Sequence, residues 1–167
     1  MTKGIMTAQF DHEKLDVYQL EIRFITWVTP LLEELAAGRG RTREPCDQLD
    51  RASLSALLNT AEGNGKRQRP VRAKFFDDAR GSATECAGCL DALVAKRVVS
   101  EERILDGKRI LVRIVSILCA LVDRFDNPGQ LKDEPPKNTF DILPEPQRVR
   151  YSSKISRTRT TTRRNRE

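Results

Sequence analysis

The sequence predicts an all-α protein, an antiparallel up-and-down four-helix bundle followed by a disordered basic C-terminal tail. Three observations lead to this fold class. Apolar residues recur at steps of three and four in four segments, which is the spacing of one helix face. The links between these segments are short and contain glycine, proline or polar residues. No segment shows the alternation of a half-buried strand, so four helices with short links are expected to pack as antiparallel neighbours.

The first predicted helix begins at Asp11, whose side chain can cap it, and ends at Gly38, which readily adopts the left-handed conformation. Pro30 lies inside this segment and removes a backbone donor, so a kink or a break is expected near Val28 and Thr29. The apolar face expected to be buried comprises Leu15, Tyr18, Ile22, Ile25, Val28, Leu32 and Leu35.

The second predicted helix follows an exposed basic loop, residues 38–44, and begins at Pro45, because a proline in the first turn loses no helical hydrogen bond. It ends at Gly63, a suitable C-terminal cap. Small residues dominate its apolar face, so a neighbouring backbone can approach closely. That face comprises Cys46, Leu49, Ser53, Ala56, Leu57 and Thr60.

The third predicted helix begins near Pro70, and the fourth begins after Ser100 and continues to about Phe125. Gly81 and Gly88 lie inside the third helix, where glycine is unfavourable, and they are interpreted as positions of close packing. The buried face of the third helix is expected to comprise Val71, Phe75, Ala79, Ser82, Cys86, Cys89, Leu90 and Leu93. That of the fourth comprises Ile104, Leu111, Ile114, Val115, Leu118, Leu121 and Phe125.

The chain of 167 residues is long enough for one domain with a sizeable core. The bundle takes residues 11–126, between a short lead, residues 1–10, and a proline-containing tail, residues 127–167. The tail has no apolar stripe and carries eight basic residues but no acidic one from residue 148 to residue 166. We therefore expect it to be disordered. The formal net charge of +6 favours polyanionic partners.

The expected compartment is the cytoplasm, with all four cysteines as free thiols. No basic start followed by an apolar run indicates a signal peptide. No apolar run approaches the roughly 20 residues that cross a bilayer, so no membrane contact is expected.

One stretch near the end of the second helix carries an unusual combination of residues, Asn59-Thr-Ala-Glu62-Gly63-Asn-Gly65-Lys66, and Gly81-Ser82-Ala-Thr-Glu85 follows on the third helix. Together with Leu15–Tyr18, Gln48–Ser55 and Lys74–Phe76, these elements resemble the four-helix-bundle proteins encoded in bacterial large-subunit rRNA intervening sequences. The resemblance covers about residues 10–126.

The resemblance implies a four-helix bundle that assembles as a ring-like homopentamer and has no catalytic activity. A related branch, the accessory variability determinant of diversity-generating retroelements, implies RNA and a reverse transcriptase as partners of a basic surface. Two departures concern the partner more than the fold. The basic loop after the first helix replaces an aromatic-proline and acidic segment, and Asp50-Arg51 replaces a pair of arginines.

The polar residues of the signature have two interpretations. In an antiparallel helix pair, Asn59 and Glu62 can meet Ser82 and Glu85, with Arg51 or Arg80 beside them. Such a cluster would set the register of the two helices. The alternative is contact with a ligand or RNA. The structural signature comprises Arg51, Asn59, Glu62, Gly63, Gly65, Gly81, Ser82 and Glu85.

A second group of residues is basic and leads into the N-terminus of the third helix, which itself favours phosphate. The alternative is a solvated charged loop. A nucleotide-binding loop is excluded, because the Gly-x4-Gly-Lys spacing is missing and the stretch follows a helix. The predicted nucleic-acid-binding residues are Arg39, Arg41, Arg43, Lys66, Arg67, Arg69, Arg72 and Lys74.

Catalysis, metal binding and a cofactor are not expected. The Cys86-x-x-Cys89 pair lies in the middle of a helix, where nothing activates a thiol, and His12 is the only histidine. The predicted function is a non-enzymatic oligomeric module that binds nucleic acid through a basic surface. RNA is the expected nucleic acid, and the expected role is that of an accessory to a reverse transcriptase. The alternative is a scaffold ring that binds a protein. Its subunit contacts are expected at Phe24, Trp27, Phe76, Val112 and Ile117.

Overall fold

The computed structural model describes residues 10–37 and 43–126. These residues form a short 3-10 helix, η1, and four α-helices, and they contain no strand, which confirms the predicted fold class. The predictions for residues 1–9, 38–42 and 127–167 lie outside the described residues. The elements are η1 (Asp11–Lys14), α1 (Asp16–Ala37), α2 (Arg43–Gly65), α3 (Arg69–Ala95) and α4 (Glu101–Asp126).

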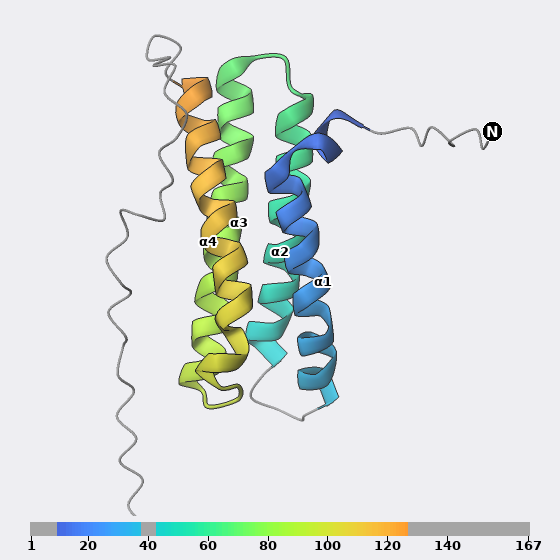
Figure 1. Cartoon of the computed structure of the whole chain (residues 1–167), viewed down its shortest axis with the longest axis vertical. Coiled ribbons are helices and arrows are strands. Elements are labelled where there is room, and N and C mark those ends of the chain that lie inside the picture. Colours follow the sequence, from blue (N-terminus) through green and yellow to red (C-terminus); the bar gives the residue numbers. More distant parts are fainter. Residues whose placement is uncertain (1–9, 38–42, 127–167) are drawn as a thin grey trace, which may run out of the picture. The chain divides into compact units, whose positions relative to one another are not determined.

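Each α-helix packs against the next along the chain, and α1 also packs against α4, so the four helices enclose one core (Figure 1). Successive helices run in opposite directions. The N-terminus of α1, the link from α2 to α3 and the C-terminus of α4 therefore lie at one end of the bundle. The other end holds the C-terminus of α1, the N-terminus of α2 and the link from α3 to α4.

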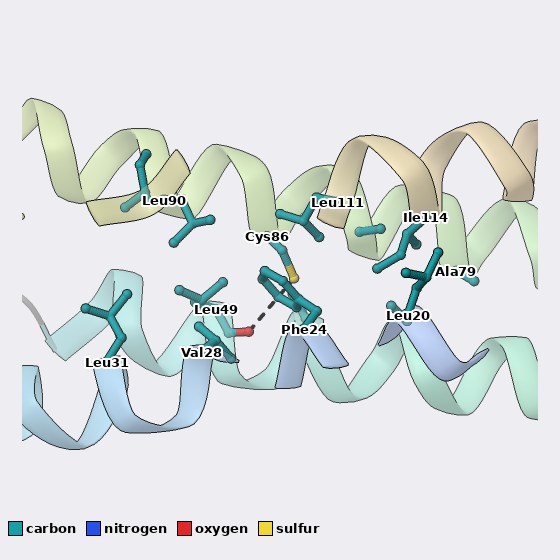
Figure 2. Packing of buried hydrophobic residues seen from close by; sticks show 14 of the residues in the cluster. Leu20, Phe24, Val28, Leu31, Leu49, Ala79, Cys86, Leu90, Leu111 and Ile114 are labelled. Atoms are coloured by element: carbon teal, nitrogen blue, oxygen red, sulfur yellow. Dashed lines mark hydrogen bonds between the residues drawn. The ribbon is translucent and has the colours of Figure 1, made fainter. Parts of the chain in front are cut away.

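The core consists mainly of aliphatic side chains, with single aromatic residues between them. Figure 2 shows Phe24 of α1 beside Val28, facing Leu49 of α2, Cys86 of α3 and Leu111 of α4. All five side chains are buried. Complete burial of one such aliphatic or aromatic side chain contributes about 1.5–3 kcal/mol to folding, so this layer contributes strongly to stability.

The buried face of α1 differs from the predicted one. Of the predicted residues, Val28 and Leu35 are buried, and Leu15 and Leu32 pack against the core. Tyr18 and Ile25 are only partly buried and Ile22 is 39% exposed, so the first half of the predicted stripe is displaced from the core. The helix buries Val17, Leu20, Glu21, Phe24, Val28, Leu31 and Leu35. Two apolar stripes run along α1, and the larger Phe24 side chain lies in the one that faces the core.

The predicted faces of α2 and α4 are confirmed in their main positions, because Leu49, Thr60, Ile104 and Leu118 are all buried. On α3 the second half of the predicted face is buried, but the first half is displaced. The helix buries Ala73 and Phe76 in place of Val71 and Phe75, which are half-buried.

Burial also corrects the predicted subunit contacts. Phe24 and Phe76 lie in the core of the monomer, and Trp27 and Ile117 pack against that core. Of the five predicted contact residues, Val112 alone is largely exposed. Phe24 and Phe76 were assigned to an outer face because parts of the predicted buried faces of α1 and α3 differ from the observed ones.

The structure corrects two predictions about the backbone. The α1 helix continues through Pro30, so of the kink or break expected there, the break does not occur. Both Pro30 and Thr26 are exposed, so water can reach the Thr26 carbonyl that loses its helical donor. Gly63 does not end α2, which continues to Gly65. A Cβ atom at Gly63 would lie 2.9 Å from the Cβ atom of Phe75, so the glycine permits a close approach of α2 and α3.

Gly81 and Gly88 do not serve close packing within the chain. A Cβ atom added at either position would meet no atom within 4 Å, and both residues are exposed. Besides Gly63, close packing requires a glycine at Gly107 of α4, because a Cβ atom there would overlap the indole ring of Trp27.

Candidate nucleic-acid interface

The link between α2 and α3 places the basic segment at one end of the bundle. The α2 helix ends with a hydrogen bond of 3.2 Å from the Lys66 backbone N–H to the Gly63 carbonyl. Gln68 precedes α3 without a side-chain capping bond, and Pro70 follows in the first turn. We call Lys66, Arg67, Arg69 and Arg72 the basic turn. All four side chains are at least partly exposed.

Two arginines of the basic turn bind the C-terminal carbonyl groups of neighbouring helices. Arg72 donates to the backbone carbonyl of Asn64 at 2.7 Å and to its side-chain Oδ1 at 2.8 Å. Arg69 donates to the backbone carbonyl of Arg124, in the last turn of α4. Both bonds place positive charge at a helix C-terminus, where the helix dipole favours it.

The Phe125 ring supports the same two arginines. The guanidinium carbon of Arg72 lies 4.8 Å from the ring centroid, and that of Arg69 lies 5.3 Å from it. Phe125 in turn packs beside Phe76 of the core, with 5.7 Å between the ring centroids. The arginines are therefore held in fixed positions by cation–π contacts as well as hydrogen bonds.

The two lysines of the segment form ion pairs with carboxylates four residues away in the sequence. Lys66 lies 2.7 Å from the Glu62 carboxylate, and its ammonium lies 4.8 Å from the Phe75 ring centroid. Lys74 lies 2.7 Å from the Asp78 carboxylate, an interaction that raises the pKa of Lys74. Such exposed pairs contribute roughly 0–1 kcal/mol, so a phosphate can replace the carboxylate.

Arg67 differs from these residues, because it is exposed and forms no ion pair within the described part of the chain. Arg69 and Arg72 also form no ion pair there, because their partners are neutral carbonyl groups and an aromatic ring. Arg69 is exposed like Arg67, whereas Arg72 is half-buried. Three positive charges of the basic turn therefore have no carboxylate partner among residues 10–37 and 43–126.

The structure does not bring all predicted basic residues together. Arg43 is the first residue of α2, where its Nε atom lies 3.6 Å from the Asp47 carboxylate. The 22 helical steps from there to Gly65 span roughly 33 Å at about 1.5 Å per residue. Arg43 therefore lies at the opposite end of the bundle from the basic turn, and Arg39 and Arg41 lie outside the described residues.

The signature residues form two small polar groups between α2 and α3. In the first, the Ser55 and Ser82 hydroxyl groups lie 2.9 Å apart, and the Asn59 amide donates to the Ser55 oxygen at 3.2 Å. In the second, the Gln48 amide donates to the Glu85 carboxylate at 2.6 Å.

Arg51 donates to Gln48 and so belongs to the second group. Glu62 belongs to neither, because it pairs with Lys66, and Arg80 pairs with Asp77. The expected meeting of the signature residues therefore occurs in part, through Ser55 and Gln48 as intermediaries.

Sequence reasoning missed a buried acid. Glu21 of α1 is 2% exposed, and its Oε1 atom accepts a hydrogen bond of 2.8 Å from the Thr60 hydroxyl of α2. Its Oε2 atom is buried and has no hydrogen-bond partner in the described structure. Burial raises the pKa of Glu21 to about 8. Glutamate at a position between Leu20 and Phe24 was the signal that could have revealed it.

The cysteine pair has an environment that opposes thiol chemistry. Cys86 is completely buried, and burial raises the pKa of its thiol to about 12. Burial also raises the pKa of Cys89. Within the described residues, no group of three or more histidine, cysteine, aspartate or glutamate side chains is arranged to hold a metal ion. None of the described helices is long and apolar enough to cross a membrane.

The fold and this interface define a small helical-bundle protein with a basic turn at one end. A family model described as 23S rRNA-intervening sequence protein matches residues 13–120, which include α1, α2 and α3 and most of α4. The chain belongs to this family. No curated protein matches it.

Proposed function

We propose that the protein is a non-enzymatic, oligomeric module that binds nucleic acid through the basic turn. The observation that carries this proposal is the group of three arginines, Arg67, Arg69 and Arg72, that have no carboxylate partner among the described residues. Guanidinium groups bind phosphate oxygens in a fixed fork geometry, and the N-terminus of α3 adds partial positive charge beside them.

RNA is the first polyanion to test. The family name links its members with ribosomal RNA, and the net charge of the chain is +6. Contacts of arginine with phosphate carry no sequence information. The proposed interaction is therefore a binding of the RNA backbone that tolerates many sequences.

The test measures the affinity for a labelled RNA by fluorescence anisotropy at several salt concentrations. Arg67→Ala should weaken binding severalfold and lower the slope of log K against log salt by about 0.7–0.9, the change expected for one lost phosphate contact. Arg43→Ala is the matched control, because it removes the same charge from the opposite end of the bundle. Equal effects of both variants, or no binding of wild-type protein at low salt, would contradict the proposal.

Self-assembly is the second part of the proposal. Leu54 and Leu58 of α2 are 51% and 57% exposed and lie one helical turn apart, so both point away from the core on the same side of the helix. A second copy of the chain covering these residues would remove apolar area from water. The resemblance to the family implies five copies in a ring.

Light scattering tests the assembly. The wild-type protein should have the mass of an oligomer at micromolar concentration, and the double variant Leu54→Ser/Leu58→Ser should have the mass of a monomer. The matched control is Ile22→Ser/Leu105→Ser, which changes exposed apolar residues of α1 and α4. A wild-type monomer would contradict this part of the proposal and leave RNA binding intact.

A reverse transcriptase is the protein partner that the related retroelement branch implies for the basic surface. The alternative function is a scaffold ring that binds a protein without nucleic acid, and the exposed leucines of α2 favour it. Co-purification with a reverse transcriptase that is lost on RNase treatment supports the first function. A stable oligomer that binds no RNA supports the second.

A further inference from the structure

The segment before α1 is held in place although it contributes no buried side chain. The η1 helix has no buried residue. Its geometry is set by hydrogen bonds from the Phe10 backbone N–H to the Glu13 carboxylate, at 2.6 Å, and from the Gln19 amide to the Glu13 carbonyl, at 2.8 Å. Leu15, the residue that follows η1, packs against the core, and the hydrogen bonds fix the exposed residues before it.

These bonds support a row of three aromatic rings. Phe10 and His12 are stacked, with 5.6 Å between the ring centroids and 14° between the ring planes. The rings of His12 and Tyr18 meet edge to face, with 4.8 Å between the centroids and 68° between the ring planes. Phe10 is 71% exposed, so the face of its ring that points away from His12 is open to water. We call Phe10, His12 and Tyr18 the aromatic row.

The aromatic row lies at the end of the bundle that carries the basic turn. The η1 helix packs against α1 and α2, and the N-terminus of α1 lies at the same end as the link from α2 to α3 (Figure 1). Neighbouring helix axes in bundles are about 8–10 Å apart, so this end is on the order of 20 Å across. A single strand of a few nucleotides can cover it, since single-strand binding modules occupy about 4–16 nucleotides.

The aromatic row is surrounded by carboxylates, whereas the basic turn at the same end of the bundle is positively charged. Asp11 pairs with Lys14 at 3.0 Å, and the Glu13 carboxylate accepts the Phe10 backbone N–H. Asp16 begins α1 nearby. These carboxylates disfavour phosphate at the row itself. A bound strand is therefore expected to place its phosphates on the basic turn and a base on the row.

We propose that the aromatic row receives an unpaired base, which makes single-stranded nucleic acid the ligand of this end of the bundle. The proposal rests on the proposed function of the basic turn. In a duplex the base faces are covered by neighbouring base pairs, whereas an unpaired base can stack on an exposed aromatic ring. Stacking is tolerant of sequence, in keeping with a surface whose other contacts are to phosphates.

The experiment compares a labelled single-stranded RNA of about ten nucleotides, a length within the usual site size, with the duplex of the same sequence. Phe10→Ala should weaken binding of the single strand by about 5- to 150-fold, the range measured for the loss of one stacked base. Binding of the duplex should change by less than about twofold, and the salt slope should be unaltered because no phosphate contact is lost. Phe10→Tyr keeps the ring and should retain affinity for the single strand.

Leu105→Ala is the matched control, because it truncates a different exposed apolar residue, which lies near the start of α4. The stacking proposal is overturned if Phe10→Ala changes neither affinity, or weakens single strand and duplex alike, while Arg67→Ala still weakens binding. Failure of the wild-type protein to bind either RNA would instead overturn the proposed function and this inference with it.

Discussion

The Thr60 hydroxyl of α2 donates a hydrogen bond of 2.8 Å to Oε1 of Glu21 on α1, and both side chains are completely enclosed by the bundle. The second carboxyl oxygen of Glu21 has no partner in the described structure. An ionised carboxylate at this position would be poorly compensated, so burial keeps Glu21 protonated near neutral pH and raises its pKa to about 8.

The first prediction is that the free energy of unfolding falls as the pH rises from about 4.5 to about 8. In this interval the folded protein keeps the Glu21 proton, whereas the unfolded chain, with the ordinary pKa of 4.5, has released it. The decrease approaches about 1.4 kcal/mol per pH unit and ends above pH 8, where both states are ionised.

Glu21→Gln isolates this effect, because glutamine is neutral and similar in shape. Urea unfolding at pH 5, 7 and 9 measures the free energy of unfolding of both proteins. The two values should be closest at pH 5, and the variant should become more stable than the wild type as the pH rises. A difference between the two proteins that is the same at all three pH values would show that Glu21 does not titrate in this way.

The second prediction concerns Gly107, which lies against the Trp27 indole. Gly107→Ala should destabilise the protein by about 1–3 kcal/mol, because the ring must move to admit a methyl group. The better helix propensity of alanine, up to about 1 kcal/mol, offsets part of this loss. Thermal unfolding measures the result. Restoration of stability in Gly107→Ala/Trp27→Leu, which has a smaller side chain at position 27, would confirm the cause.

The third prediction is the opposite result at Gly81 and Gly88. Both are exposed helical positions with open space around them, so alanine should raise stability by up to about 1 kcal/mol at each. Urea unfolding of each single variant measures this gain. Gly65 is also surrounded by open space but ends its helix, so Gly65→Ala is expected to gain less. If Gly81→Ala lowered stability instead, Gly81 would take part in a close contact that is absent within the single chain.

The sequence predicted the four helices because their ends carry strong signals, such as Pro45, Pro70 and Ser100, and because their apolar spacing is regular. It did not predict which side of α1 faces the core. A stripe through Ile22 and another through Phe24 both have helical spacing, and Glu21 beside Phe24 argued against the stripe that is in fact buried.

The sequence indicated which basic residues belong to the candidate interface, but not which groups of neighbouring helices they contact. The pair Lys66–Glu62 follows from a spacing of four residues at the end of α2. The bonds of Arg72 to Asn64 and of Arg69 to Arg124 cross between helices, and no spacing in the sequence indicates them. The aromatic row was missed for the same reason, because it depends on the turn between η1 and α1.

The fourth prediction concerns Arg97, which joins α3 to α4 with a φ of 59°, in the left-handed region. The Val98 backbone N–H donates to the Leu93 carbonyl at 3.0 Å across this turn, so the conformation completes the end of α3. Left-handed backbone is unfavourable by roughly 1–2 kcal/mol for a residue with a Cβ atom. Arg97→Gly should therefore raise stability by up to about 1 kcal/mol in urea unfolding, whereas Arg97→Val should lower it.

The last prediction separates the structural arginine of the basic turn from the exposed one. Arg72→Ala removes both hydrogen bonds to Asn64 and the contact with Phe125, so stability should fall by about 1–3 kcal/mol. Arg67→Ala removes an exposed side chain and should change stability by less than about 0.5 kcal/mol. Urea unfolding of both variants without RNA measures these values. Equal stability of the two variants would show that Arg72 does not hold the end of α2, and its guanidinium would then be as free for phosphate as that of Arg67.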